Sequence, residues 1–125
     1  MYIYYNENPQ NKNVGDCTAR AIGKAMGKTW KQIYVELCAQ GLSMADYPDS
    51  NAVWGAYLME NGFTRQIMPQ TCPYCYTIGD FADEHKKGTY VLATGTHVVC
   101  VKDGDIYDSF DSSDYAVMYY FEKVE

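Results

Sequence analysis

The sequence predicts an α+β fold in which a helical first half packs on a C-terminal antiparallel sheet. Apolar residues recur with the period of a helix up to about residue 60, whereas short extended runs separated by turns follow from residue 89. Helices followed by strands in this order are typical of the α+β class. The 125 residues, 47% of them hydrophobic, contain no internal repeat. We therefore expect a single domain over residues 1–125, which at this size buries roughly two thirds of its unfolded surface.

The first expected elements are a short strand and a helix joined by a polar loop. Residues 2–5 are tyrosines and an isoleucine suited to a strand, and residues 6–13 are too polar to contribute to a core. Asp16 is a favourable N-cap for a helix that ends at Gly27. Cys17 then lies in the first turn of this helix.

Two further helices are indicated by capping residues and apolar spacing. The Thr29-x-x-Gln32 pattern is a capping box, and Gly41 is expected to end the helix that follows it. Apolar residues at helical spacing line this helix: Trp30, Ile33, Tyr34, Leu37 and Cys38. The next helix is expected from about Ser50 to Asn61, with one apolar face. That face consists of Val53, Trp54, Tyr57 and Leu58.

A strand and a short helix are expected before the chain becomes extended. The strand covers Phe63–Met68, and the helix begins at the capping box Thr77-x-x-Asp80 and ends near His85-Lys-Lys-Gly88. Four extended runs follow, and we expect them to form an antiparallel meander. The runs are residues 90–94, 97–102, 105–110 and 115–121.

The Asp103-Gly104 turn predicts the register of one hairpin in this sheet. A two-residue turn at these positions pairs residues whose numbers sum to 207, so Val99 faces Asp108. Because side chains alternate along a strand, His97 shares the face of Val99 and lies diagonal to Asp108. A three-residue turn would instead move Asp108 to the other face. Asp111 is the alternative partner of His97 if the strand ends early.

Cys17, His97 and Asp108 have the chemistry of an activated nucleophile. Peptide dipoles and unpaired N–H groups at a helix start favour a thiolate. His97 would form an ion pair with the thiolate and later protonate the leaving group, while Asp108 would orient the imidazole. This requires the N-terminus of the first helix to dock against the face of the sheet that carries His97.

The negative charge that develops on the attacked carbonyl needs hydrogen-bond donors. Backbone N–H groups at the helix start are suited to this role, and one side-chain amide is worth roughly 3 to 4 kcal/mol in related hydrolases. Asn11, six residues before Cys17, is the first candidate for the oxyanion hole. Asn13 and Gln10 are the alternatives.

The order of these residues resembles the papain-like cysteine peptidase fold. A cysteine opens a helix, a histidine begins a strand, and an Asp or Asn lies on the next strand. The segments Gly15-Asp-Cys-Thr-Ala-Arg-Ala21 and His97-Val-Val-Cys-Val-x-Asp-Gly-x-Ile-Tyr-Asp108 are similar to small papain-fold proteins encoded by bacteria and their phages, described as cysteine peptidases. Unlike papain, the chain has Thr18 after the cysteine and Asn11 in place of a glutamine. The resemblance implies a hydrolase with a Cys-His-Asp triad that cleaves amide or isopeptide bonds.

Other functions remain open at this stage. The same Cys-His chemistry serves amidohydrolases, deamidases and acyltransferases, and an inactive papain-like fold could be a binding or inhibitor module. Cys72-Pro-Tyr-Cys75 matches the dithiol of glutaredoxins, but it follows three helices instead of opening a βαβ unit. One such pair supplies only two ligands, so we expect no metal and no cofactor.

The charge and the cysteine count limit the partners and the compartment. The net charge of -6, without a cluster of Lys or Arg, argues against binding of DNA or RNA. No apolar run approaches the roughly 20 residues of a membrane span. Five cysteines, an odd number, favour a reducing compartment, so we expect a cytoplasmic protein. The expected partner is a peptide or protein substrate whose sequence is not predicted, and the oligomeric state is not predicted either.

Overall fold

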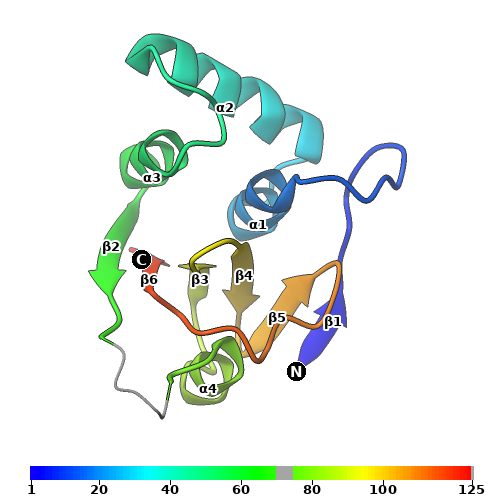
Figure 1. Ribbon diagram of the computed structural model, residues 1–125, viewed down its shortest axis with the longest axis vertical. Helices are drawn as coiled ribbons and strands as arrows, with labels where there is room; N and C mark the ends of the chain where they lie inside the picture. Colours follow the sequence, from blue (N-terminus) through cyan, green and yellow to red (C-terminus); the bar gives the residue numbers. More distant parts are fainter. Residues whose placement is uncertain (70–74, 125) are drawn as a thin grey trace.

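The computed structural model describes residues 1–69 and 75–124, which form a mixed α+β structure with four helices and a six-stranded sheet. The helices are α1 (Cys17–Met26), α2 (Trp30–Met44), α3 (Asn51–Glu60) and α4 (Ile78–Glu84). The strands are β1 (Tyr2–Tyr4), β2 (Phe63–Ile67), β3 (Thr89–Ala93), β4 (Val98–Lys102), β5 (Asp105–Asp108) and β6 (Tyr119–Lys123). Figure 1 shows α1, α2 and α3 on one side of the sheet and α4 on the other.

The strand order, β1-β5-β4-β3-β6-β2, corrects the expected meander. Strands β3, β4 and β5 are consecutive antiparallel neighbours, but β6 pairs with β3 instead of β5. The free edge of β5 is taken by β1, which runs parallel to it. The last strand also begins later than expected, because the backbone N–H of Tyr115 still bonds to Ser112 in a turn.

The hairpin between β4 and β5 has the predicted register. Cys100 pairs with Tyr107, Val101 with Ile106 and Lys102 with Asp105, and each pair sums to 207. Both turn residues have positive φ, 51° at Asp103 and 82° at Gly104. This is the conformation that a two-residue hairpin of the Asp-Gly type requires.

Helix starts follow the capping residues of the sequence, and one predicted helix end is wrong. The capping boxes at Thr29 and Thr77 are both formed, and the Ser50 side chain accepts a bond from Val53 N. However, α2 continues past Gly41 to Met44. The glycine serves close packing instead, because a Cβ there would lie 2.6 Å from the carbonyl oxygen of Asp46.

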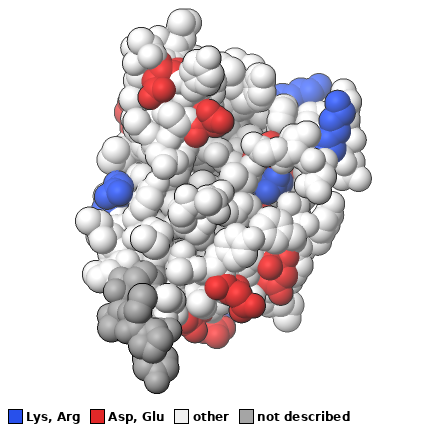
Figure 2. Space-filling model, viewed as in Figure 1, with Lys and Arg blue, Asp and Glu red and all other residues white. Residues whose placement is uncertain are grey.

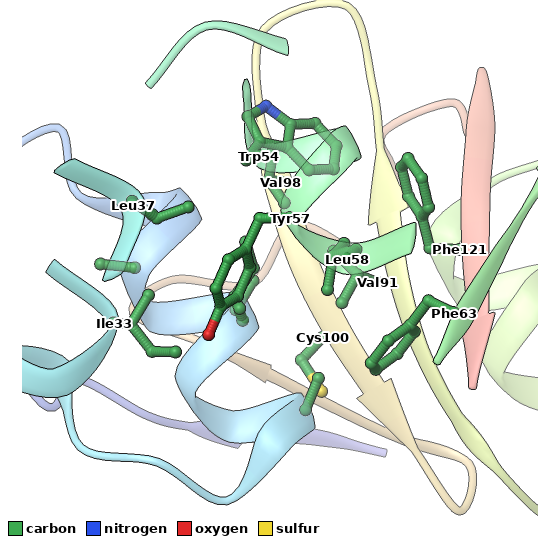
Figure 3. Packing of buried hydrophobic residues seen from close by; sticks show 14 of the residues in the cluster. Ile33, Leu37, Trp54, Tyr57, Leu58, Phe63, Val91, Val98, Cys100 and Phe121 are labelled. Carbon is green, nitrogen blue, oxygen red and sulfur yellow. The ribbon is translucent and has the colours of Figure 1, made fainter. Parts of the chain in front are cut away.

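The sheet separates two hydrophobic clusters. On one face, residues of α1, α2 and α3 pack against Val91, Val98 and Cys100, and Figure 3 shows Leu58 of α3 beside Val91 of β3. On the other face, α4 packs against alternate residues of the same strands. These residues include Tyr90, Leu92, Val99 and Val101. Strand β3 is buried along its whole length because helices cover both faces.

Acidic side chains dominate the charged surface of the face drawn in Figure 2. Few Lys and Arg side chains are visible on this face, and they form no continuous patch. Within residues 1–69 and 75–124, no helix has the length and the apolar character needed to span a membrane.

Candidate active site

Cys17 is the first residue of α1 and lines a cleft where strand β3 ends and strand β4 begins. The half-buried thiol faces a cleft of about 180 Å³, formed with the N-terminal end of α3 and the turn between β3 and β4. The cleft contains Asn51 and Trp54 on the α3 side and residues 93–98 on the sheet side. The thiol is therefore accessible at a helix start and shielded on its inner side.

The structure brings His97 and Asp108 together as the hairpin register predicts. His97 Nε2 lies 2.6 Å from Asp108 Oδ2, and both side chains are buried. Because Nε2 is occupied by the carboxylate, Nδ1 is the ring nitrogen left to interact with Cys17, which lines the same cleft and whose pKa is lowered by His97. The imidazole thus connects the thiol and the carboxylate.

The docking of α1 differs from the expected one. Helix α1 packs on the Val98 and Cys100 face, whereas the alternation of the strand places His97 on the opposite face, with Val99. Cys17 nevertheless reaches His97 because His97 precedes β4 and lies at the end of the sheet. The site therefore spans the strand ends, where β4 begins and β5 ends.

Electrostatics favour a thiolate and an imidazolium at this site. Burial opposes both charges, but hydrogen bonds with Asp108 and Cys17 raise the pKa of His97 to about 9. Burial also favours the neutral thiol of Cys17, yet the bonds from His97, from the Val98 N–H and from Thr18 lower its pKa. The pKa of Asp108 is lowered despite its burial, through the bonds from His97 and Ser112. These shifts favour the thiolate, the imidazolium and the carboxylate over their neutral forms.

Asp108 has more partners than the sequence suggested. The Ser112 hydroxyl donates to Oδ2 at 2.6 Å, and the Ser109 N–H donates to Oδ1 at 2.8 Å. Arg20 Nη2 lies 3.4 Å from Oδ1, and the same guanidinium forms an ion pair with Asp16. These contacts fix the carboxylate that orients His97.

Asp16 is the N-cap residue of α1, but its side chain does not cap the helix. The carboxylate instead binds Arg20 and accepts a bond from Trp30 Nε1 at 2.9 Å. The N–H groups of the first turn, which lack partners within a helix, are thereby left without a side-chain cap. They are available for the developing oxyanion beside Cys17.

The side-chain candidates for the oxyanion hole lie in the exposed loop before α1. Asn11, Asn13 and Gln10 are exposed, Asn11 has a φ of 53°, and none of the three lines the cleft at Cys17. The amide side chain that lines this cleft belongs to Asn51, whose Oδ1 accepts a bond from Trp54 Nε1 at 3.0 Å. Asn51 is distant from Cys17 in sequence, and no local pattern indicates it.

Two aromatic residues cover His97 and were also missed by the sequence reasoning. Phe110 and Tyr115 place their ring centroids 4.9 Å and 5.9 Å from that of His97. They lie in the segment between β5 and β6, which returns across the end of the sheet (Figure 1). Their rings limit the access of water to the His97 and Asp108 pair.

The remaining cysteines and the second histidine lie elsewhere. Cys100 is fully buried, which raises its pKa to about 12, and Cys38 is half-buried on α2. His85 forms the C-cap of α4. Cys75 is exposed, whereas Cys72, the other half of the Cys72-Pro-Tyr-Cys75 motif, lies outside the described residues. Among the residues that are described, no group of three His, Cys, Asp or Glu side chains could hold a metal ion.

No family model, curated protein or solved structure matches this chain. The interpretation of the site therefore depends on the geometry of Cys17, His97 and Asp108 and on their charge state.

Proposed function

We propose that this protein is a papain-like cysteine hydrolase that cleaves amide or isopeptide bonds of a peptide or protein substrate. One observation carries the proposal: His97 lines the same cleft as Cys17, at the start of α1, and its Nε2 lies 2.6 Å from Asp108 Oδ2. A cysteine retained only for packing would need neither partner. The lowered pKa of Cys17 favours the thiolate, which is the nucleophile. The raised pKa of His97 favours the imidazolium, which donates the proton.

Acylation uses the charged pair directly. The Cys17 thiolate attacks the substrate carbonyl carbon and forms a C–S bond, and the carbonyl electron pair moves to oxygen. The resulting oxyanion is stabilised by the uncapped N–H groups at the start of α1. His97 then transfers its proton to the leaving nitrogen as the C–N bond breaks, which leaves a thioester on Cys17 and a neutral imidazole.

Deacylation restores the starting state. Neutral His97 removes a proton from water, and the oxygen of this water attacks the thioester carbonyl. The C–S bond breaks, the acid product leaves, and His97 and Cys17 again form the imidazolium and thiolate pair. Asp108 keeps Nε2 of the ring in one orientation during both steps. An amine in place of water would make the same site an acyltransferase.

Trapping of the thioester tests the proposal. We would incubate the chain with a mixture of peptide amides and detect both acylated protein and cleaved peptides by mass spectrometry. Turnover should be lost in Cys17→Ala and retained in Cys75→Ala, a matched control because Cys75 is an exposed thiol outside the cleft. Equal turnover in both variants would refute the assignment of Cys17. Peptide binding without any acylation would favour a binding module.

A further inference from the structure

A second cavity adjoins the cleft at Cys17. It encloses about 550 Å³ between the loop that precedes α1 and the outer helix α2. Its wall is mostly apolar, and the apolar side chains are Val14, Ala19, Trp30, Tyr34, Leu37 and Pro48. Pockets of this size and apolar character are typical of ligand sites.

The cavity and the cleft share part of their walls. Gly15, Thr18 and Asp49 line both of them, and Gly15 and Thr18 lie on either side of Cys17 in the chain. A substrate that presents its carbonyl to Cys17 therefore passes the mouth of the cavity. The space beside Gly15 is open, because a Cβ built there would meet no atom within 4 Å, so a long side chain at this position could extend into it.

Part of the apolar wall of the cavity is exposed, whereas Ala19 and Leu37 are buried. Tyr34 is 55% exposed and Val14 is 48% exposed. The rings of Trp30 and Tyr34 stack on each other with centroids 5.1 Å apart, which gives the wall a rigid aromatic part. Flat, fixed rings of this kind favour apolar and aromatic groups of a ligand.

The polar groups near the cavity do not specify a charged occupant. Asp16, which contributes to the wall, already binds Arg20 and the indole N–H of Trp30. Lys12 and Asp49 also line the cavity and carry opposite charges. The part of the cavity surface that is available to contact a ligand is therefore the apolar wall.

We propose that this cavity binds a bulky apolar side chain of the substrate, adjacent to the carbonyl group that Cys17 attacks. The inference rests on the proposed function, because it takes Cys17 as the nucleophile and the shared wall as the path of the substrate. It adds the substrate class: peptides with a large aliphatic or aromatic residue next to the cleaved bond. A glycine or charged residue at that place would leave the apolar wall in contact with water.

Two alkylating reagents separate this inference from the proposed function. Iodoacetamide reports the nucleophilicity of Cys17, and N-phenethyl-iodoacetamide carries the same electrophile with an apolar extension that can enter the cavity. The readout is the ratio of their second-order rate constants at Cys17, divided by the same ratio for the urea-unfolded chain. Burial of much of an aromatic ring should raise this normalised ratio by about tenfold or more.

Three variants locate the origin of the preference. Gly15→Leu should close the passage, and Tyr34→Ser should remove part of the apolar wall, so both should bring the normalised ratio close to 1. Val35→Ser is the matched control, because Val35 follows Tyr34 on α2, is 65% exposed and does not line the cavity. Circular dichroism would verify that each variant is folded.

The outcomes distinguish the two proposals. A high ratio that falls in both cavity variants and persists in Val35→Ser supports the inference. A normalised ratio near 1 in the unmodified chain, or a high ratio that persists in both cavity variants, overturns it even if iodoacetamide reacts selectively with Cys17. If Cys17 shows no enhanced reaction with iodoacetamide, the proposed function itself fails.

Discussion

Replacement of His97 by glutamine should abolish the enhanced reactivity of Cys17 near pH 6. The amide of His97→Gln can still donate a hydrogen bond to Asp108, but it carries no charge at any pH. In the unmodified protein, the pKa of His97 is about 9, so the imidazolium is present at pH 6 and lost above pH 9. The variant therefore removes the cation that holds the thiolate, and it leaves the burial that favours the thiol.

The size of the effect follows from the ionised fraction of the thiol. A peptide thiol with a pKa of about 8.5 is roughly 0.3% ionised at pH 6, so the largest gain that a lowered pKa of Cys17 can give is about 300-fold, at complete ionisation. Nucleophilicity falls as the pKa of a thiol falls, with a Brønsted coefficient of about 0.4 to 0.5, which offsets nearly half of this gain on a logarithmic scale. The net acceleration at pH 6 therefore has an upper limit of about 20- to 30-fold. His97→Gln should lose all of it.

The assay is alkylation by iodoacetamide from pH 5 to pH 10, with each cysteine followed by mass spectrometry. The exposed Cys75 and the urea-unfolded chain provide reference rates in the same samples. At pH 10, His97 is neutral in the unmodified protein, so the two proteins should react at rates within about threefold of each other. Equal rates at pH 6, or a constant ratio of rates from pH 6 to pH 10, would refute the ion pair.

Three further predictions concern the groups around the site. Arg20→Gln breaks two buried ion pairs, which leaves Asp16 without a cation and Asp108 with His97 alone, so unfolding in urea should show a loss of about 3 to 5 kcal/mol. Lys28→Gln, at a half-exposed pair, should cost less than about 1 kcal/mol. Gly41→Ala should destabilise the protein by about 1 to 3 kcal/mol because its Cβ would collide with backbone, while Gly15→Ala should change the stability by less than about 0.5 kcal/mol. The lowered pKa of Asp108 contributes stability that is present above about pH 4 and lost as the pH falls through its folded-state value. Asp108→Asn should therefore be less stable at pH 7 and show a weaker acid dependence between pH 4 and pH 2, and a slope equal to that of the unmodified protein would contradict this.

The contact between His97 and Asp108 was accessible from the sequence because it depends on local rules. The Asp103-Gly104 turn determines the register of the hairpin, and the alternation of side chains then places both residues on one face. The same reasoning could not find Asn51, since its place in the cleft depends on how α3 packs against the sheet. Ser112 was also missed, because no short pattern predicts that the loop after β5 turns back toward Asp108.

The end of α2 illustrates a limit of local patterns. A glycine after an apolar helical stretch usually indicates a helix end. Gly41 instead lies inside α2, where the chain after the helix folds back against it, and the helix ends at Met44 with Ala45 as its C-cap, at a φ of 54°. The reason for this glycine is a contact made after the helix has formed, and sequence spacing carries no information about that contact.

By itself, the sequence determined most helix starts, the buried strands and the pairing of His97 with Asp108, because capping, periodicity and turn geometry act over a few residues. Tertiary structure decided the rest. It placed β6 beside β3, docked α1 on the Val98 face, and brought Cys17 to His97 across the strand ends. These arrangements depend on the burial of apolar surface between elements that are distant in the chain, which is non-directional and leaves no short pattern in the sequence.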